Sequence, residues 1–194
     1  MRQAILERVF SVIPLDTVAM EQARLRQQQL TKPAGSLGRL EDIAIQMAGI
    51  TRQLQPEIKQ KAVIIMAADH GVAREGVSAY PSDVTAQMVH NFLRGGAAIN
   101  ALARSAGAKV VVVDVGVAAD LSHPDLVSRK VAPGTADLAV EHAMNEAYML
   151  QAIQVGMDVF DEQIQSGIDL IATGDMGIGN TTASSAITSV LLQT

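Results

Sequence analysis

The stretch AKVVVVDVGV, residues 108–117, is a short run of mostly β-branched residues that includes an aspartate and a glycine near its end. Two comparable runs occur in the chain, KAVIIMAAD at residues 61–69 and GIDLIATGD at residues 167–175. Apolar runs of this length are typical of strands buried on both faces of a parallel sheet. Segments with helical periodicity separate them, so we predict right-handed crossovers between parallel strands. The expected fold class is α/β, with an open, mostly parallel, Rossmann-like sheet flanked by helices.

The first part of the chain has a helical pattern instead. It covers residues 1–55 and is interrupted by a loop, KPAGSLG, at residues 32–38. We therefore expect a small helical part at residues 1–55 and an α/β domain at residues 56–194. Helical spacing also predicts two buried faces. One consists of Leu40, Ile43, Ala44, Met47 and Ile50, and the other of Leu150, Ile153, Met157, Phe160 and Ile164.

Composition excludes several classes of protein. The chain has 194 residues, a formal net charge of -5 and no cysteine. A negative charge without a long Lys/Arg run gives no electrostatic basis for binding nucleic acid or an anionic membrane. The apolar runs are too short to cross a bilayer. The lack of cysteine excludes a disulfide framework and fits a reducing compartment, so we expect a cytoplasmic protein.

The three apolar runs all lead into polar residues or glycine, among them Asp69, Asp114 and Asp175. Ligands gather at the carboxyl ends of the strands in open α/β sheets, so these ends are expected to form one edge that carries a site. After the third run comes GDMGIGNTTASSA, residues 174–186. Its glycines allow loop amides to face an anion at the start of a helix. The alternative is a tight strand-to-helix turn without a ligand.

A second group of candidate residues follows the first run, in ADHGVAREGVSAYPSDVTAQMV at residues 68–89. Asp69 and His70 suggest an acid–base pair or metal ligands, but no further histidine is placed convincingly near them. Ser82 or Asp83 is expected to cap a helix from Val84. Its predicted buried stripe is Val84, Met88 and Phe92. Gln87 could face the same cleft as Ser78 and Tyr80, or could be a solvated helix residue.

Five blocks together closely resemble the nicotinate-nucleotide:dimethylbenzimidazole phosphoribosyltransferases. They are KPAGSLGRLEDIA (32–44), the block at 68–89, NFLRGGAAINALAR (91–104), VVDVGV (112–117) and GDMGIGNTTASSA. The resemblance implies phosphoribosyl transfer from nicotinate mononucleotide to 5,6-dimethylbenzimidazole, giving α-ribazole 5'-phosphate and nicotinate, in assembly of the cobalamin lower ligand. It further implies a nucleotide-binding domain, a homodimer, and no metal or redox cofactor.

The resemblance also implies residue roles. The nucleotide phosphate is expected at the backbone of Gly177, Ile178 and Gly179, with Asn180, Thr181 and Thr182. The benzimidazole is expected against Ser78, Tyr80, Gln87 and Met176. A side chain added at Gly177 is expected to block the approach of the nucleotide. Lys32 and Arg39 either belong to a linker or lie near an anionic substrate.

Two features depart from the family pattern. Asp175 stands where the family has glutamate, and is expected to support the site rather than act as the base. The glutamate that removes the benzimidazole proton belongs to a later part of the family sequence, beyond Thr194. We therefore expect this chain to be inactive alone. The alternatives are a catalytically silent protein that binds nucleotide or benzimidazole, and a structural remnant that self-associates.

Overall fold

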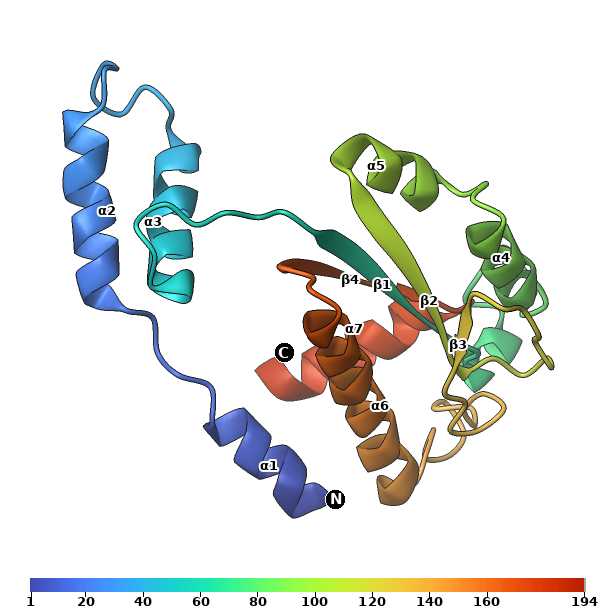
Figure 1. Ribbon diagram of the computed structural model, residues 1–194. Helices are drawn as coiled ribbons and strands as arrows, with labels where there is room; N and C mark the ends of the chain where they lie inside the picture. The colour runs from blue at the N-terminus through green and yellow to red at the C-terminus, as the bar shows by residue number, and fades with distance from the viewer. Residues whose placement is uncertain (194) are drawn as a thin grey trace. The chain divides into compact units, whose positions relative to one another are not determined.

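The computed structural model describes residues 1–193, and the chain divides into two compact units (Figure 1). The smaller unit covers residues 3–58, and the larger unit covers residues 1–2 and 59 to the C-terminal end. Within the described residues, no helix is long and apolar enough to cross a membrane.

The smaller unit is built on two helices that pack against each other, α2 (Thr17–Gln29) and α3 (Arg39–Thr51), after the short helix α1 (Arg2–Phe10). Asp16 caps α2 by accepting a hydrogen bond from the Ala19 amide (2.9 Å). Small residues form the contact: Ala23 and Ala48 are buried, and Gly49 lets the side chain of Met20 approach closely. The predicted buried face of α3 is wrong, because its large members Leu40, Ile43 and Ile50 are exposed.

The larger unit contains a four-stranded parallel sheet in the order β3-β2-β1-β4. The strands are β1 (Lys61–Ala68), β2 (Ala108–Gly116), β3 (Leu126–Ser128) and β4 (Leu170–Met176). This confirms the three predicted strands and the open α/β fold. β3 was not predicted, because three residues carry no detectable pattern. Within residues 1–193, β4 pairs only with β1, so its outer edge is open.

Helices cover both faces of the sheet. On one face, α4 (Val84–Leu93) contributes Val89 and Phe92 to a core that also contains Ile65 and Val112, and α5 (Ala98–Ala106) packs against β2. On the other face, α6 (Glu146–Gln165) packs Val155 and Val159 against the sheet. The predicted stripe of α6 is therefore wrong: Ile153, Phe160 and Ile164 remain about two-fifths exposed.

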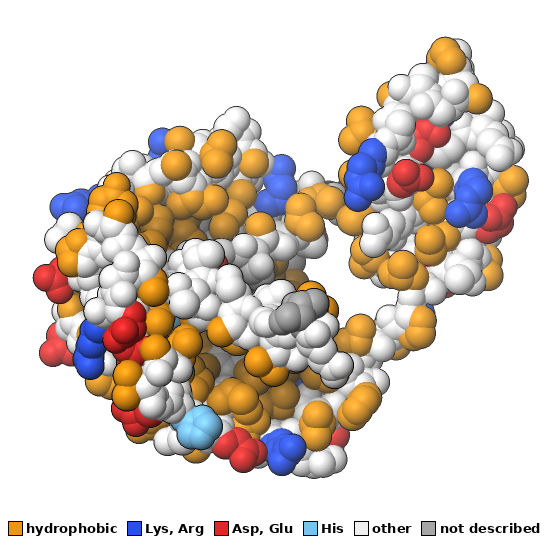
Figure 2. Space-filling model, turned by 180° about the vertical axis from the view of Figure 1, so that it is seen from behind, with side chains coloured by type: hydrophobic (Ala, Val, Ile, Leu, Met, Phe, Trp, Pro, Cys, Tyr) orange, Lys and Arg blue, Asp and Glu red, His pale blue; other side chains and the backbone are white. Residues whose placement is uncertain are grey.

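The last helix, α7 (Asn180–Leu192), has no buried residue. Its apolar side chains are among the most exposed of the chain, with Val190 at 78% and Leu191 at 75%. Figure 2 shows hydrophobic side chains exposed over the face of the larger unit on which α7 lies.

Candidate functional site

The carboxyl ends of β1, β2 and β4 meet at one edge of the sheet. In the register of the strands, Ala67 pairs with Met176 and Ala68 pairs with Gly116. The segments that follow all three strands therefore start side by side. This confirms the expectation that the polar and glycine-rich strand ends share one edge.

The glycine loop, defined here as Gly177–Gly179, connects β4 to α7 and lies directly against the end of β1. A Cβ atom added at Gly177 would be 2.1 Å from the carbonyl oxygen of Ala68 and 2.8 Å from Cδ2 of His70. Only glycine allows this close approach. A side chain here would collide with the end of β1, so close packing inside the protein already requires glycine at this position. Gly179 has φ of 90°, a left-handed conformation that favours glycine.

One hydrogen bond joins the glycine loop to α4. The Ile178 amide donates to Oγ1 of Thr85 (3.1 Å), and both residues are buried. The amide of Ile178 therefore points into the protein and not toward a ligand. The Asn180 amide is also used, because it donates to the Gly177 carbonyl (3.0 Å) and closes the turn.

The first turn of α7 offers further hydrogen-bond donors. The amides of Thr181 and Thr182 lie at an open helix N-terminus, where amides and the helix dipole favour an anion. The side-chain amide of Asn180 donates to the carboxylate of Asp175, which is exposed. These residues, predicted as site residues, are therefore brought together by the structure.

His70 borders the glycine loop and two cavities. It lines a cavity of about 340 Å³ together with Gly116 and Tyr148, and a second of about 520 Å³ next to α7. Burial lowers the pKa of His70 below its ordinary value, against the opposing charges of Asp69 and Asp175. Burial therefore favours the neutral form of this imidazole.

Asp69 makes hydrogen bonds that join the segments at this edge of the sheet. Its Oδ2 accepts a hydrogen bond from the Ala118 amide (2.7 Å), and its carbonyl accepts one from the Thr135 amide (3.1 Å). The hydroxyl of Thr135 accepts the Gly71 amide (3.1 Å). Asp69 thus fixes the segments after β1 and β2.

Within residues 1–193, no cluster of three or more His, Asp or Glu side chains could hold a metal ion.

Three of the residues expected around the benzimidazole lie on α4 and the segment before it. The Ser78 hydroxyl accepts the Tyr80 amide (3.2 Å), Tyr80 is 66% exposed, and Gln87 is exposed on α4. No hydrogen bond joins Gln87 to either of them in the part of the chain that the structure describes. The fourth, Met176, is half-buried and packs against the α4 side of the core.

Two local predictions for α4 are confirmed in part. The helix starts at Val84 with Asp83 at the N-cap position, as predicted, but no side-chain hydrogen bond caps it. Phe92 is buried as predicted, whereas the other buried residues are Thr85 and Val89 and not Val84 and Met88. Sequence reasoning missed Thr85, although a threonine on an otherwise apolar stripe is itself a signal of a buried hydrogen bond.

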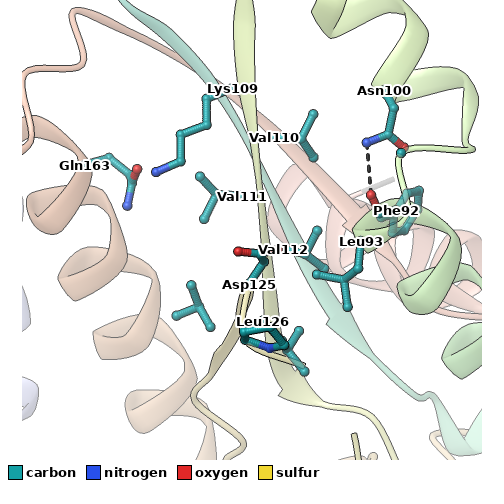
Figure 3. A pocket seen from close by; sticks show the side chains of 13 residues that line it. Phe92, Leu93, Asn100, Lys109, Val110, Val111, Val112, Asp125, Leu126 and Gln163 are labelled. Atoms are coloured by element: carbon teal, nitrogen blue, oxygen red, sulfur yellow. Dashed lines mark hydrogen bonds between the residues drawn. The ribbon is translucent and has the colours of Figure 1, made fainter. Parts of the chain in front are cut away.

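Lys32 binds Glu41 (2.7 Å) inside the smaller unit, where its side chain is 12% exposed. A cavity of about 420 Å³ lies where β2 begins, beside Lys109, Asn100 and Gln163 (Figure 3). Asn100 there donates to the Phe92 carbonyl (3.0 Å). No predicted site residue lines this cavity.

A sequence family described as phosphoribosyltransferase matches residues 12–194, and the chain belongs to this family. Its relatives include the protein named nicotinate-nucleotide--dimethylbenzimidazole phosphoribosyltransferase from Chloroflexus aggregans, 63% identical over 92% of this chain and 51% of that protein. The protein of the same name from Roseiflexus sp. is 58% identical over 95% of this chain and 53% of its own length.

A solved structure agrees with these relatives. The crystal structure of CobT from Thermus thermophilus matches with a TM-score of 0.88 at 52% identity, covering 90% of this chain and 53% of that one. The comparisons confirm the family resemblance and the fold class predicted from the sequence. The chain spans about half the length of the relatives that it matches.

Proposed function

We propose that the chain is part of an enzyme that transfers the phosphoribosyl group of nicotinate mononucleotide to 5,6-dimethylbenzimidazole. The products are α-ribazole 5'-phosphate and nicotinate, and the reaction serves assembly of the cobalamin lower ligand. The observation that most supports this proposal is the glycine loop, which presents an open helix N-terminus and is bonded to α4, the helix that carries Gln87. The names of the relatives agree with it.

The nucleotide phosphate binds at Gly177–Thr182 in this proposal. The amides of Thr181 and Thr182 and their hydroxyl groups supply donors, and the helix dipole favours the negative charge. Ile178 contributes through its position, since its amide already donates to Thr85. The side chain of Asn180 holds Asp175.

The benzimidazole binds on the α4 side of the same edge. Ser78, Tyr80 and Gln87 supply a few polar groups, and the exposed part of Met176 supplies apolar contact. A largely neutral pocket suits a neutral aromatic acceptor, because apolar contact gives affinity and a small number of polar groups fix orientation.

Departure of the leaving group, nicotinate, needs little catalytic assistance from the protein. Nicotinate departs from a quaternary pyridinium as a neutral ring nitrogen, so no acid has to protonate it. The attacking benzimidazole nitrogen loses a proton, which requires a general base. We assign a supporting role to Asp175, and place the base in the half of the relatives' length that this chain does not span. A missing general base costs a factor of about 100 to 10,000 in rate.

A second candidate function is binding of the nucleotide or benzimidazole without catalysis. The open outer edge of β4 and the uncovered apolar side chains of α7 favour it for the isolated chain, because part of the site's surroundings is uncovered. A structural remnant that self-associates through these surfaces is the third candidate. We further propose that the whole protein is a cytoplasmic homodimer, as the family resemblance implies.

Experiments on the purified chain distinguish the three candidate functions. Calorimetry with nicotinate mononucleotide and with dimethylbenzimidazole measures binding, and chromatography of α-ribazole phosphate measures turnover. We expect binding of the nucleotide with no useful turnover. Turnover equal to that of a full-length relative would make Asp175 a competent base. A folded chain that binds neither compound would leave only the structural remnant.

A further inference from the structure

The hydroxyl of Thr85 is a polar group placed deep in an apolar environment. Thr85 is fully buried and shares one helix face with Val89 and Phe92, which belong to the hydrophobic core. A buried hydroxyl at such a position is unfavourable unless it is hydrogen-bonded. Its oxygen accepts the amide of Ile178, which lies across the sheet edge in the glycine loop.

The same bond satisfies a buried backbone donor. Ile178 is only 9% exposed, and its amide has no other partner in the described part of the chain. Without the oxygen of Thr85, this amide would remain unpaired in the interior, and the loop would have to turn to reach water or another acceptor. The conformation of the glycine loop therefore depends on one side chain of α4.

On the opposite side, close packing against the end of β1 and the segment after it holds the loop. Gly177 lies against the Ala68 carbonyl and the ring of His70, and Gly179 lies near Val72. Between residues 1 and 193, the Thr85 bond is the hydrogen bond that ties the loop to α4. The loop is thus fixed between β1 on one side and α4 on the other.

The geometry points to Thr85 as a positioning residue that sets the place of the nucleotide loop relative to the acceptor pocket. This inference rests on the proposed function, in which the loop binds phosphate and Gln87 faces the benzimidazole. Gln87 lies on the same helix but on the side opposite to Thr85, so the bond acts through the helix: it fixes α4, which carries Gln87, against the loop. Small displacements between reacting groups are costly in group transfer, which gives this bond a functional consequence.

Two substitutions test the role of the hydroxyl oxygen of Thr85. Thr85→Val keeps the shape and removes the acceptor, whereas Thr85→Ser keeps the acceptor. We expect Thr85→Val to weaken binding of nicotinate mononucleotide to the chain by about tenfold, and Thr85→Ser to restore most of the affinity. Calorimetry measures both, at a temperature where circular dichroism shows each variant folded.

A matched control separates positioning from general loss of stability. Val89→Ala removes apolar contacts from the same helix face and core and keeps the Thr85 hydroxyl that accepts the Ile178 amide. It is expected to lower the melting temperature while leaving nucleotide affinity within about twofold. Equal affinity losses in Thr85→Val and Val89→Ala would overturn the positioning role, and so would unchanged affinity in Thr85→Val.

Hydrogen exchange gives a readout that does not depend on the substrate. The Ile178 amide of the chain should exchange about tenfold faster or more in Thr85→Val than in Thr85→Ser, measured by NMR as a local change relative to the amides of β1. If the wild-type chain binds no nucleotide, the proposed function fails. Faster exchange confined to the loop would then still support the structural part of this inference, and equal exchange in both variants would refute it.

Discussion

The side-chain amide of Asn180 donates a hydrogen bond to the carboxylate of Asp175, and so links the end of β4 to the first residue of α7. The carboxylate lies close enough to His70 to oppose the lowering of its pKa. The glycine loop spans the few residues between these two partners. Their bond therefore closes the loop from the outside, as the Thr85 bond does from the inside.

We expect Asn180→Ala to weaken nucleotide binding. The change frees the Asp175 carboxylate, which can then turn toward the phosphate and repel it. Two unit charges about 4 Å apart in water repel by about 1 kcal/mol, which predicts an affinity loss of about fivefold. Calorimetry with nicotinate mononucleotide measures it. Thr188→Ala is the control, because Thr188 is exposed on the same helix and its hydroxyl donates only to Ser184 within the helix. Equal affinity in both variants would contradict the role of Asn180.

Gly177→Ala should reduce the free energy of unfolding by about 2 kcal/mol or more, because an added methyl group forces the loop away from β1. Urea denaturation followed by circular dichroism measures the change. Gly156→Ala provides the comparison, since a Cβ at Gly156 meets no atom within 4 Å. In the interior of α6 alanine is favoured by about 1 kcal/mol, so this variant should be slightly more stable. A Gly177→Ala protein as stable as the wild type would show that the loop can move at little cost.

Lys130→Met should be strongly destabilising, because Lys130 is the partner of a buried charge. Asp114 is 1% exposed at the end of β2, and the two groups are 3.5 Å apart. Removing one member of a fully buried pair costs about 3–5 kcal/mol, and we expect a loss near the lower end of this range because Lys130 itself is 24% exposed. The neighbouring Arg129 forms an exposed pair with Glu162 (2.8 Å), and Arg129→Met should cost less than about 1 kcal/mol. Similar losses in the two variants, measured by urea denaturation, would contradict this difference.

The stability of the chain should fall as the pH drops through the ordinary pKa of histidine, in part because of His70. Its pKa is lowered in the folded state, mainly by burial, so the unfolded chain binds a proton more readily. The stabilising contribution is present above pH of about 6.5 and is lost as the pH falls below it. His70→Asn should flatten the dependence of the unfolding free energy on pH between about 7 and 5, relative to His90→Asn on the surface of α4. An unchanged slope in His70→Asn would contradict this prediction.

The strands and the edge that carries the candidate site could be predicted, because runs such as Val110–Val113 have one stable place in a parallel sheet. Helix faces were harder. α6 carries apolar residues on more than one side, and the sequence pattern favoured Ile153 and Phe160 over Val155 and Val159. Only the packed sheet determines which side is buried.

The internal contacts of the site were beyond sequence reasoning. A glycine in a loop suggests room for a ligand, whereas Gly177 serves contact with Ala68. Thr85 looked like one polar position among others on α4, because its partner Ile178 follows much later in the chain. Long-range contacts of this kind leave no periodic signal in the sequence.

The register of β4 against β1 determines which side chains lie on each face of the sheet. Asp175 pairs with Met66 and Met176 pairs with Ala67, so these two neighbours point to opposite faces. Met176 packs on the side of α4, and Met66 on the side of α6. A one-residue slip of β4 along β1 would exchange the carboxylate and the thioether between the two faces while leaving the number of ladder hydrogen bonds nearly unchanged. An insertion or deletion of one residue in β4 would therefore exchange the polar and the apolar side chain between the two faces at the candidate site, while the strands would stay paired.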